Sequence, residues 1–285
     1  MTVAIRPIAA EDAETCGTIC YEAFAAIANA HNFPPDFPSP EVAIGLIRMM
    51  VGHPEVFGVA AEVDGRLAGS NFLWEQSSIV GVGPITIDPN AQNAGVGRRL
   101  MQAVIERADA NGRAGVRLVQ AAYHGRSLSL YTRLGFDPRE PLALLQGPAI
   151  GKQVPGAVVR PAAAADAEAC DAVCRAAHGH DRRGEVRDAI AQGTARLVER
   201  EGRLTGYSTS IGFFGHAVGE TNDDLKALIA AAAAFEGPGM LMPMRNAEVF
   251  RWCLEEGLRV VQPMTLMSRG AYQEPKGAFL PSILF

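Results

Sequence analysis

The chain has 285 residues, which is long enough for two ordinary domains. Hydrophobic residues make up 48%, charged residues 20%, and the formal net charge is −5. An acidic chain without a basic block offers no electrostatic reason to expect a nucleic-acid partner. The N-terminal residues lack the apolar core of a signal peptide, and the longest apolar run, 227–235, is too short to cross a bilayer. We therefore expect a globular, cytoplasmic protein without a membrane partner.

The first predicted elements are a strand near residues 3–7 and a helix that follows Asp12, a residue type favoured at helix caps. This helix carries Cys16 and Cys20, four residues apart. The chain has five cysteines, with no C-x-x-C pair and no further metal-ligating residues close to them. We interpret the cysteines as small buried residues, and we expect no metal site.

The most informative segment is a glycine-containing loop between a strand and a helix. A β-branched run, 85–87, ends before Pro89, the loop contains Gly95 and Gly97, and apolar residues then recur at helical spacing until Gly112. The first turn of such a helix presents unpaired N–H groups and the positive end of the helix dipole, and glycine lets a ligand approach the backbone. The segment therefore predicts a site for a phosphate-bearing cofactor.

The spacing of the glycines separates the candidate cofactors. A dinucleotide fingerprint requires G-x-G-x-x-G, but Leu100 stands in place of the third glycine, and no Gly-Lys-Ser/Thr of a nucleotide hydrolase is present here. The pattern Gln92-x-x-Gly95-x-Gly97 resembles the acetyl-CoA loop of the GNAT N-acetyltransferases. Tyr131, 34 residues after Gly97 and just before Leu-Gly-Phe, resembles the second motif of that family.

This resemblance implies an α/β fold with a mixed (α+β) sheet that binds acetyl-CoA. The pantetheine arm would pair with the strand at 83–87, and a main-chain N–H near Ile87 would polarise the thioester carbonyl. Arg98 and Arg99 would be supplementary cations for the pyrophosphate, or else solvated residues of the helix face. The residues assigned to the cofactor in this way are Ile85, Ile87, Gln92, Asn93, Ala94, Gly95, Val96, Gly97, Arg98 and Arg99.

The resemblance also makes Tyr131 the general acid that protonates the departing thiolate. A phenol with an ordinary pKa of about 10 is a suitable donor to a thiolate whose ordinary pKa is about 8.5. The alternative is a half-buried tyrosine that packs its helix against the sheet.

The general base stays open between several candidates. Many members of the family carry a glutamate on the strand before the loop, but residues 82–87 contain no carboxylate, and Asp88 is placed for a turn. Glu75, at the end of the previous strand, could act directly or through water. His124, after the strand 116–122, titrates in the useful range. A water chain or an amine that is already neutral would need neither residue.

A proline-rich, aromatic loop is predicted at residues 31–41, between two helices. In the family, the corresponding loop overhangs the acceptor site. Prolines hold such a loop stiff, Phe33 and Phe37 offer apolar surface, and Asp36 could bind a cationic amine. The alternative is a connector whose phenylalanines pack into the core.

The second half of the chain repeats the first. Residues 3–24 and 157–178 align without gaps at ten identities in 22 positions, and the hairpin turns at 62–69 and 199–206 also match. We therefore predict two tandem GNAT-like domains, 1–148 and 156–285, joined by a linker at 149–155 within a stretch, 146–156, that contains three glycines and two prolines. The pair would form an intramolecular pseudo-dimer.

The second copy lacks the acetyl-CoA loop. Glu220, Asp223 and Asp224 crowd its expected helix start, Cys253 aligns with Tyr131, and Asn246 aligns with His124. We therefore predict a degenerate second domain and chemistry in the first. The predicted function is direct acetyl transfer from acetyl-CoA, without a metal, to a primary amine of a small molecule or peptide. The alternative is a non-catalytic, regulatory module that binds acyl-CoA.

Overall fold

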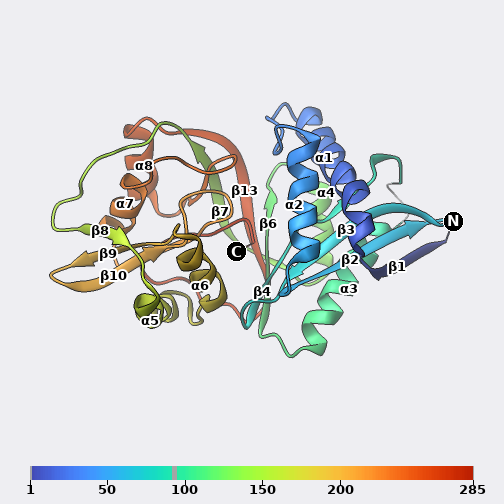
Figure 1. Cartoon of the computed structure of the whole chain (residues 1–285). Coiled ribbons are helices and arrows are strands. Elements are labelled where there is room, and N and C mark those ends of the chain that lie inside the picture. The colour runs from blue at the N-terminus through green and yellow to red at the C-terminus, as the bar shows by residue number, and fades with distance from the viewer. Residues whose placement is uncertain (1, 92–94, 285) are drawn as a thin grey trace. The chain divides into compact units, whose positions relative to one another are not determined.

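The computed structural model describes residues 2–91 and 95–284. Its internal contacts divide the chain into two compact units, which we describe separately (Figure 1). The first unit comprises Met1–Glu75, Ile79–Leu118 and Tyr123–Asp137, and the second comprises Gln76–Ser78, Val119–Ala122 and Pro138–Phe285.

The first unit contains a mixed sheet and four helices among its described residues. Neighbouring strands lie in the order β1-β2-β3-β4-β6, with β5 beside β3. The pairs from β1 to β4 are antiparallel, whereas β4 and β6 are parallel, as predicted for a mixed sheet. The elements are β1 (Val3–Pro7), α1 (Ala13–Ala30), α2 (Pro40–Gly52), β2 (Val56–Val63), β3 (Arg66–Trp74), β4 (Ile79–Val82), β5 (Thr86–Ile87), α3 (Val96–Ala110), β6 (Gly115–Ala121) and α4 (Gly125–Arg133).

Two adjacent residues of β3 show how helices cover both faces of this sheet. Side chains of neighbouring strand residues point to opposite faces. Phe72 is fully buried in a core cluster with Cys16 of α1 and Ile47 of α2. Asn71 instead donates a hydrogen bond to the Leu100 carbonyl of α3 at 3.3 Å. The helices α1 and α2 therefore lie on one face, and α3 lies on the other.

The second unit contains a five-stranded sheet in the order β14-β11-β10-β9-β8. It also contains β7, which pairs antiparallel with β12 and has β13 as its other neighbour. The elements are β7 (Asp137–Gln146), β8 (Val158–Pro161), α5 (Ala167–His178), α6 (Arg183–Gln192), β9 (Arg196–Arg200), β10 (Arg203–Ser208), β11 (Ala217–Gly219), α7 (Asn222–Ala230), β12 (Met240–Pro243), α8 (Ala247–Glu255), β13 (Arg259–Gly270) and β14 (Ala278–Leu280).

The predicted repeat recurs in the structure as one ion-pair network found twice. In the first unit, Arg6 binds Asp12 at 2.6 Å and Glu62 at 2.8 Å. In the second, Arg160 binds Asp166 at 2.8 Å and Glu199 at 2.7 Å. Each network ties the start of a helix to the first strand and to the hairpin beside it.

Asp12, as predicted, and its counterpart Asp166 occupy the N-cap positions of their helices, but their side chains form hydrogen bonds elsewhere. Each carboxylate accepts a hydrogen bond at 2.8 Å from a backbone N–H three residues earlier, in the short 3₁₀ turn before the helix. Neither side chain caps the α-helix itself. The arginine of each network explains this, because it draws the carboxylate back toward the strand.

The boundary between compact units differs from the sequence repeat. Strand β7 precedes the predicted linker, yet its residues from Pro138 onward belong to the second unit. No regular helix or strand occurs at 147–157, which includes the linker predicted at 149–155.

All five cysteines are buried, as predicted. Burial is the main cause that raises the pKa of each thiol, to about 11 for Cys16 and Cys174 and to about 12 for Cys170 and Cys253. The pKa of Cys20 is raised as well, by the same cause. These residues are therefore neutral packing groups at physiological pH.

The described residues contain neither a membrane-spanning helix nor a cluster of metal-binding side chains. None of the helices there is both long and apolar enough to span a bilayer. No group of three or more histidine, cysteine, aspartate or glutamate side chains there could hold a metal ion.

Candidate active site

Helix α3 begins at the predicted position, directly after Gly95. This glycine has φ +74°, a left-handed conformation that side chains disfavour, and a Cβ built on it would meet no atom within 4 Å. The first turn of α3 contains no acidic residue. The predicted residues Gln92, Asn93 and Ala94 lie outside the described part of the chain. The described residues leave the N-terminus of α3 open to an anion.

Gly97 lies where α3 packs against its neighbours. A Cβ at this position would lie 2.9 Å from Ile87 Cδ1 and 3.5 Å from Leu130 Cδ2. Glycine therefore lets α3 approach β5 and α4 closely. Val96 beside it is also buried, so the face of α3 that carries Gly97 belongs to the core.

The two arginines of α3 differ in their surroundings. Arg99 donates a hydrogen bond to the Val3 carbonyl of β1 at 2.6 Å. Arg98, the third residue of the helix, is exposed. Of the two predicted cations, Arg98 is thus better placed to approach a bound phosphate.

The strand predicted at 82–87 is interrupted. Phe72 of β3 accepts a hydrogen bond from the Gly83 N–H, whereas Ser70 is paired with Thr86. Between these two pairs, β3 advances by two residues, whereas its partner advances by three. The extra residue indicates a β-bulge at Pro84 and Ile85. The Trp74 indole donates to the Gly83 carbonyl at 3.2 Å and supports this bend.

The bulge separates the edge of this strand from β6. Pairing between β4 and β6 covers Ile79, Val80 and Gly81, and β5 pairs with β3. Asp88 N–H donates to the Ala68 carbonyl, so the preceding residue Ile87 occupies a non-hydrogen-bonded position opposite β3. Its N–H and C=O therefore point away from β3. This orientation suits the predicted role of the Ile87 N–H toward pantetheine or the thioester carbonyl.

Tyr131 lies on α4 and is only 6% exposed. Its ring packs edge-on against Phe136 at 6.3 Å between ring centroids. Burial raises the pKa of Tyr131 to about 12, and a hydrogen bond with the Ser127 hydroxyl works in the opposite direction. The phenol therefore keeps its proton at neutral pH, as a general acid requires, and it also has the packing role that was the alternative.

His124 lies at the start of the same helix. Its Nδ1 is 2.7 Å from the Ser127 hydroxyl oxygen. Burial lowers the pKa of His124, and the nearby His31 and Arg126 lower it further. The imidazole is therefore neutral near physiological pH, so it can exchange a proton with a neighbour.

Glu75 is surrounded by cations at the other end of α3. Arg107 binds its carboxylate at 3.0 Å, the Asn111 amide donates at 2.7 Å, and Arg113 lies at 3.8 Å. Arg107 follows Gly95 by twelve positions, which corresponds to about 18 Å along the helix axis. These contacts hold the Glu75 side chain as a structural group far from the start of the helix, which weakens the hypothesis that Glu75 is the base.

The predicted acceptor loop joins α1 to α2, although it ends earlier than expected because Pro40 already begins α2. Phe33 stacks on Tyr123 with 4.2 Å between ring centroids. Phe37 contacts Phe24 edge-on at 5.7 Å and packs against the core. Phe33 thus lies beside the start of α4, whereas Phe37 has the alternative, structural placement.

Tyr123 and Ser127 were not predicted as site residues. Burial raises the pKa of Tyr123 to about 12, and the negative charge of Asp36 adds to this. Asp36 therefore lies near the Phe33–Tyr123 pair and is placed to attract a cation. The position of Ser127, four residues before Tyr131 and three after His124, was visible in the sequence as a shared helix face.

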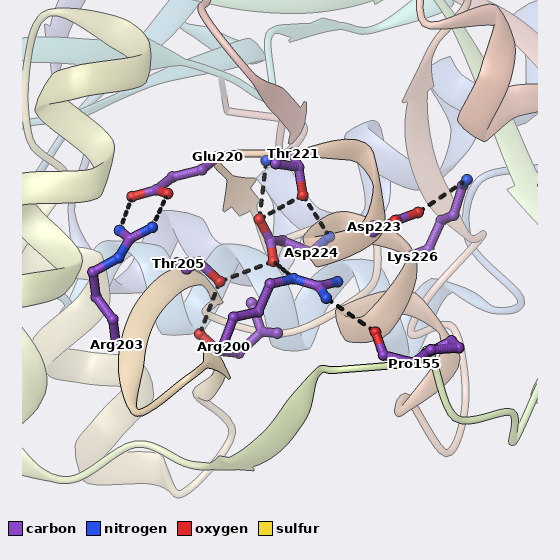
Figure 2. A network of polar contacts seen from close by, with 10 residues as sticks. Pro155, Arg200, Arg203, Thr205, Glu220, Thr221, Asp223, Asp224 and Lys226 are labelled. Atoms are coloured by element: carbon purple, nitrogen blue, oxygen red, sulfur yellow. Dashed lines mark hydrogen bonds and ion pairs between the residues drawn. The ribbon is translucent and has the colours of Figure 1, made fainter.

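The start of α7 in the second unit has the opposite character (Figure 2). Asp224, which is fully buried, accepts hydrogen bonds from the Thr221 N–H at 3.0 Å, the Thr205 hydroxyl at 2.8 Å and Arg200 at 2.7 Å. Glu220 pairs with Arg203 at 2.7 Å. A carboxylate of the protein itself therefore satisfies this helix start.

Comparisons with known proteins show what part of the chain resembles a known family. The acetyltransferase (GNAT) family model matches residues 21–136. A Pyrococcus horikoshii protein assigned provisionally as an acetyltransferase has 17% identity and a TM-score of 0.75, with 99% of this chain and 94% of that chain covered. A GCN5-related N-acetyltransferase from Sphaerobacter thermophilus has 15% identity and a TM-score of 0.62, with 96% and 97% covered. At these identities the likeness shows the fold. A comparison with curated protein sequences finds no significant match.

Proposed function

We propose that the chain transfers an acetyl group from acetyl-CoA directly to a primary amine of a small molecule or peptide, because the acetyltransferase (GNAT) family model matches residues 21–136. The observation that carries this proposal is the strand β5 leading into the open start of α3. The outward N–H of Ile87 and the first turn after Gly95, which contains no acidic residue, lie at the two ends of one short segment. Such a segment offers donors for both the thioester and the pyrophosphate of one extended cofactor.

The chemistry proposed for the first unit follows from these positions. Acetyl-CoA, when bound, supplies the activated acetyl group. The Ile87 N–H would stabilise the negative charge that develops on the thioester oxygen as the amine attacks. Tyr131, protonated at neutral pH, would donate its proton to the departing sulfur.

We propose that the acceptor approaches near the α1–α2 loop. The stacked rings of Phe33 and Tyr123 offer an apolar surface, and Asp36 supplies a negative charge close to them. This combination favours a cationic amine that carries an apolar group.

We also propose that residues 156–285 are a degenerate copy of the same fold. The duplicated arginine networks support this proposal, as does the correspondence of Tyr131 and Cys253, each the seventh residue of a nine-residue helix. The buried Asp224 at the start of α7 supports the view that this copy binds no pyrophosphate.

The test is acetyl transfer by the full chain. We would incubate it with acetyl-CoA and separate primary amines: a polyamine, an arylethylamine, an amino acid and a short peptide. We expect at least one amine to accelerate release of coenzyme A, with an acetylated product visible by mass spectrometry. If acetyl-CoA raises the melting temperature but no amine accelerates release, the chain is an acyl-CoA-binding module and the proposed reaction is wrong.

A further inference from the structure

His124, at the start of helix α4, contacts a side chain of the helix and does not cap the backbone. In the corresponding helix α8, Asn246 caps the helix, since its side-chain oxygen accepts a hydrogen bond from the Val249 N–H at 3.3 Å. His124, the corresponding residue of α4, makes no capping hydrogen bond. Its Nδ1 instead lies 2.7 Å from the hydroxyl of Ser127.

The same helix face carries the hydroxyl from His124 toward Tyr131. Residues four apart in a helix are neighbours on its surface, so Ser127 lies on the same face of α4 as Tyr131. Ser127 lowers the pKa of the Tyr131 phenol, which is the effect of a hydroxyl that donates toward the ionised phenol. The Ser127 oxygen is then available to accept a proton from His124.

We propose that His124 and Ser127 form a proton relay that resupplies Tyr131 during acetyl transfer. This inference rests on the proposed function. Both residues act through Tyr131 and are therefore positioning residues. The second unit lacks all three groups, because the matching positions are Asn246, Val249 and Cys253.

The relay balances the reaction. The amine nitrogen forms a bond with the carbonyl carbon, and the bond between that carbon and sulfur breaks. Tyr131 gives its proton to sulfur, Ser127 gives its proton to the phenolate, and His124 gives its Nδ1 proton to Ser127. His124 takes up one proton from solvent at Nε2, and the new amide nitrogen releases one proton to solvent. The net exchange of protons with solvent is therefore zero. Coenzyme A leaves as a neutral thiol.

The surroundings of His124 suit this exchange. His31, from the end of α1, lies 6.4 Å away between ring centroids, and Arg126 follows on α4. Both disfavour a positive charge on His124, as burial does. A neutral imidazole with its proton on Nδ1 is the donor that the relay requires.

The first test compares two serines of one helix. Ser129 is the matched control, because its hydroxyl donates to the Gly125 carbonyl at 2.8 Å. We expect Ser127→Ala and His124→Asn to lower kcat about tenfold each, with little change in the KM for acetyl-CoA. Ser129→Ala should leave kcat unchanged, and Ser127→Thr, which keeps the hydroxyl, should retain activity even if Ser127→Ala folds poorly.

A double variant tests whether Ser127 acts through Tyr131. We expect Tyr131→Phe to lower kcat by roughly 10²-fold, and adding Ser127→Ala should lower it no further. Independent losses that multiply would overturn the relay while leaving the acetyltransferase proposal intact. A wild-type chain that transfers no acetyl group would instead overturn the proposed function.

Nitrogen NMR of the wild-type chain gives a readout that does not depend on activity. With ¹⁵N-labelled histidine, the relay predicts that His124 is neutral near pH 7 and carries its proton on Nδ1. A proton on Nε2 instead would make Ser127 the donor to His124, and the proposed direction of transfer would be wrong.

Discussion

The starts of α3 and α7 differ in the residues that surround them. The third residue of α3 is Arg98, which is exposed, whereas the third residue of α7 is Asp224, which is buried. In α3 a left-handed Gly95 precedes the helix, and a Cβ built on it would meet none of the described residues within 4 Å. In α7 the Asp224 carboxylate already binds Thr221, Thr205 and Arg200. The third residue thus carries opposite charges at the two helix starts, and we expect only the start of α3 to accept an anion.

The strongest challenge to this comparison is Gly95→Val. The substitution places a branched side chain in left-handed backbone and in the space that the anion would occupy, so we expect acetyl-CoA affinity to fall by more than about 100-fold. Gly112→Val is the control, because Gly112 is also left-handed (φ +63°) and unobstructed, but follows the other end of α3. Calorimetric titration of both variants checks the prediction. Equal losses would mean that backbone strain, and not the site, causes the effect.

The next prediction concerns the closed helix start. Asp224→Ala leaves Arg200 and Thr205 without their buried partner, so we expect the free energy of unfolding to fall by about 3–5 kcal/mol. Asp223→Ala, beside it, removes an exposed pair with Lys226 and should cost less than about 1 kcal/mol. Denaturant unfolding measures both variants. We expect both to keep wild-type affinity for acetyl-CoA, and a large loss of affinity in the folded Asp224 variant would place cofactor contacts in the second unit.

The smallest expected effect distinguishes a structural carboxylate from a catalytic one. Glu75→Gln weakens the contacts with Arg107 and Asn111, so we expect a loss of about 1–2 kcal/mol in stability. Steady-state kinetics should show turnover within about twofold of wild type, because the cluster lies at the far end of α3 from Gly95. If turnover instead drops by roughly two orders of magnitude while stability is unchanged, Glu75 is restored as the general base.

Features defined by short stretches of sequence could be predicted, and those defined by distant residues could not. The helix from Val96 to Ala110 was predictable, because its apolar spacing and its flanking glycines are local signals. The repeat was predictable for the same reason. The bulge at Pro84 was not, since it depends on the register of two strands.

The candidate site divides in the same way. Tyr131 and Gly95 belong to local motifs and were found at their expected places on α4 and before α3. The contacts of Glu75 come from Arg107 and Asn111, more than 30 positions later in the chain. The position of Glu75 in the sequence therefore could not reveal them. Ser127 could have been found, because it shares one helix face with His124 and Tyr131.

The buried thiols have a practical consequence for measuring this reaction. With pKa values of about 11 to 12 and no exposed thiol, the described cysteines would react slowly with a thiol-specific dye at pH 8. Coenzyme A liberated by turnover would therefore be counted against a low background. On heating, the same dye becomes a reporter of unfolding, because Cys16 and Cys20 lie in the first unit and Cys170 and Cys174 in the second. Mapping which pair is labelled first would rank the two units by stability.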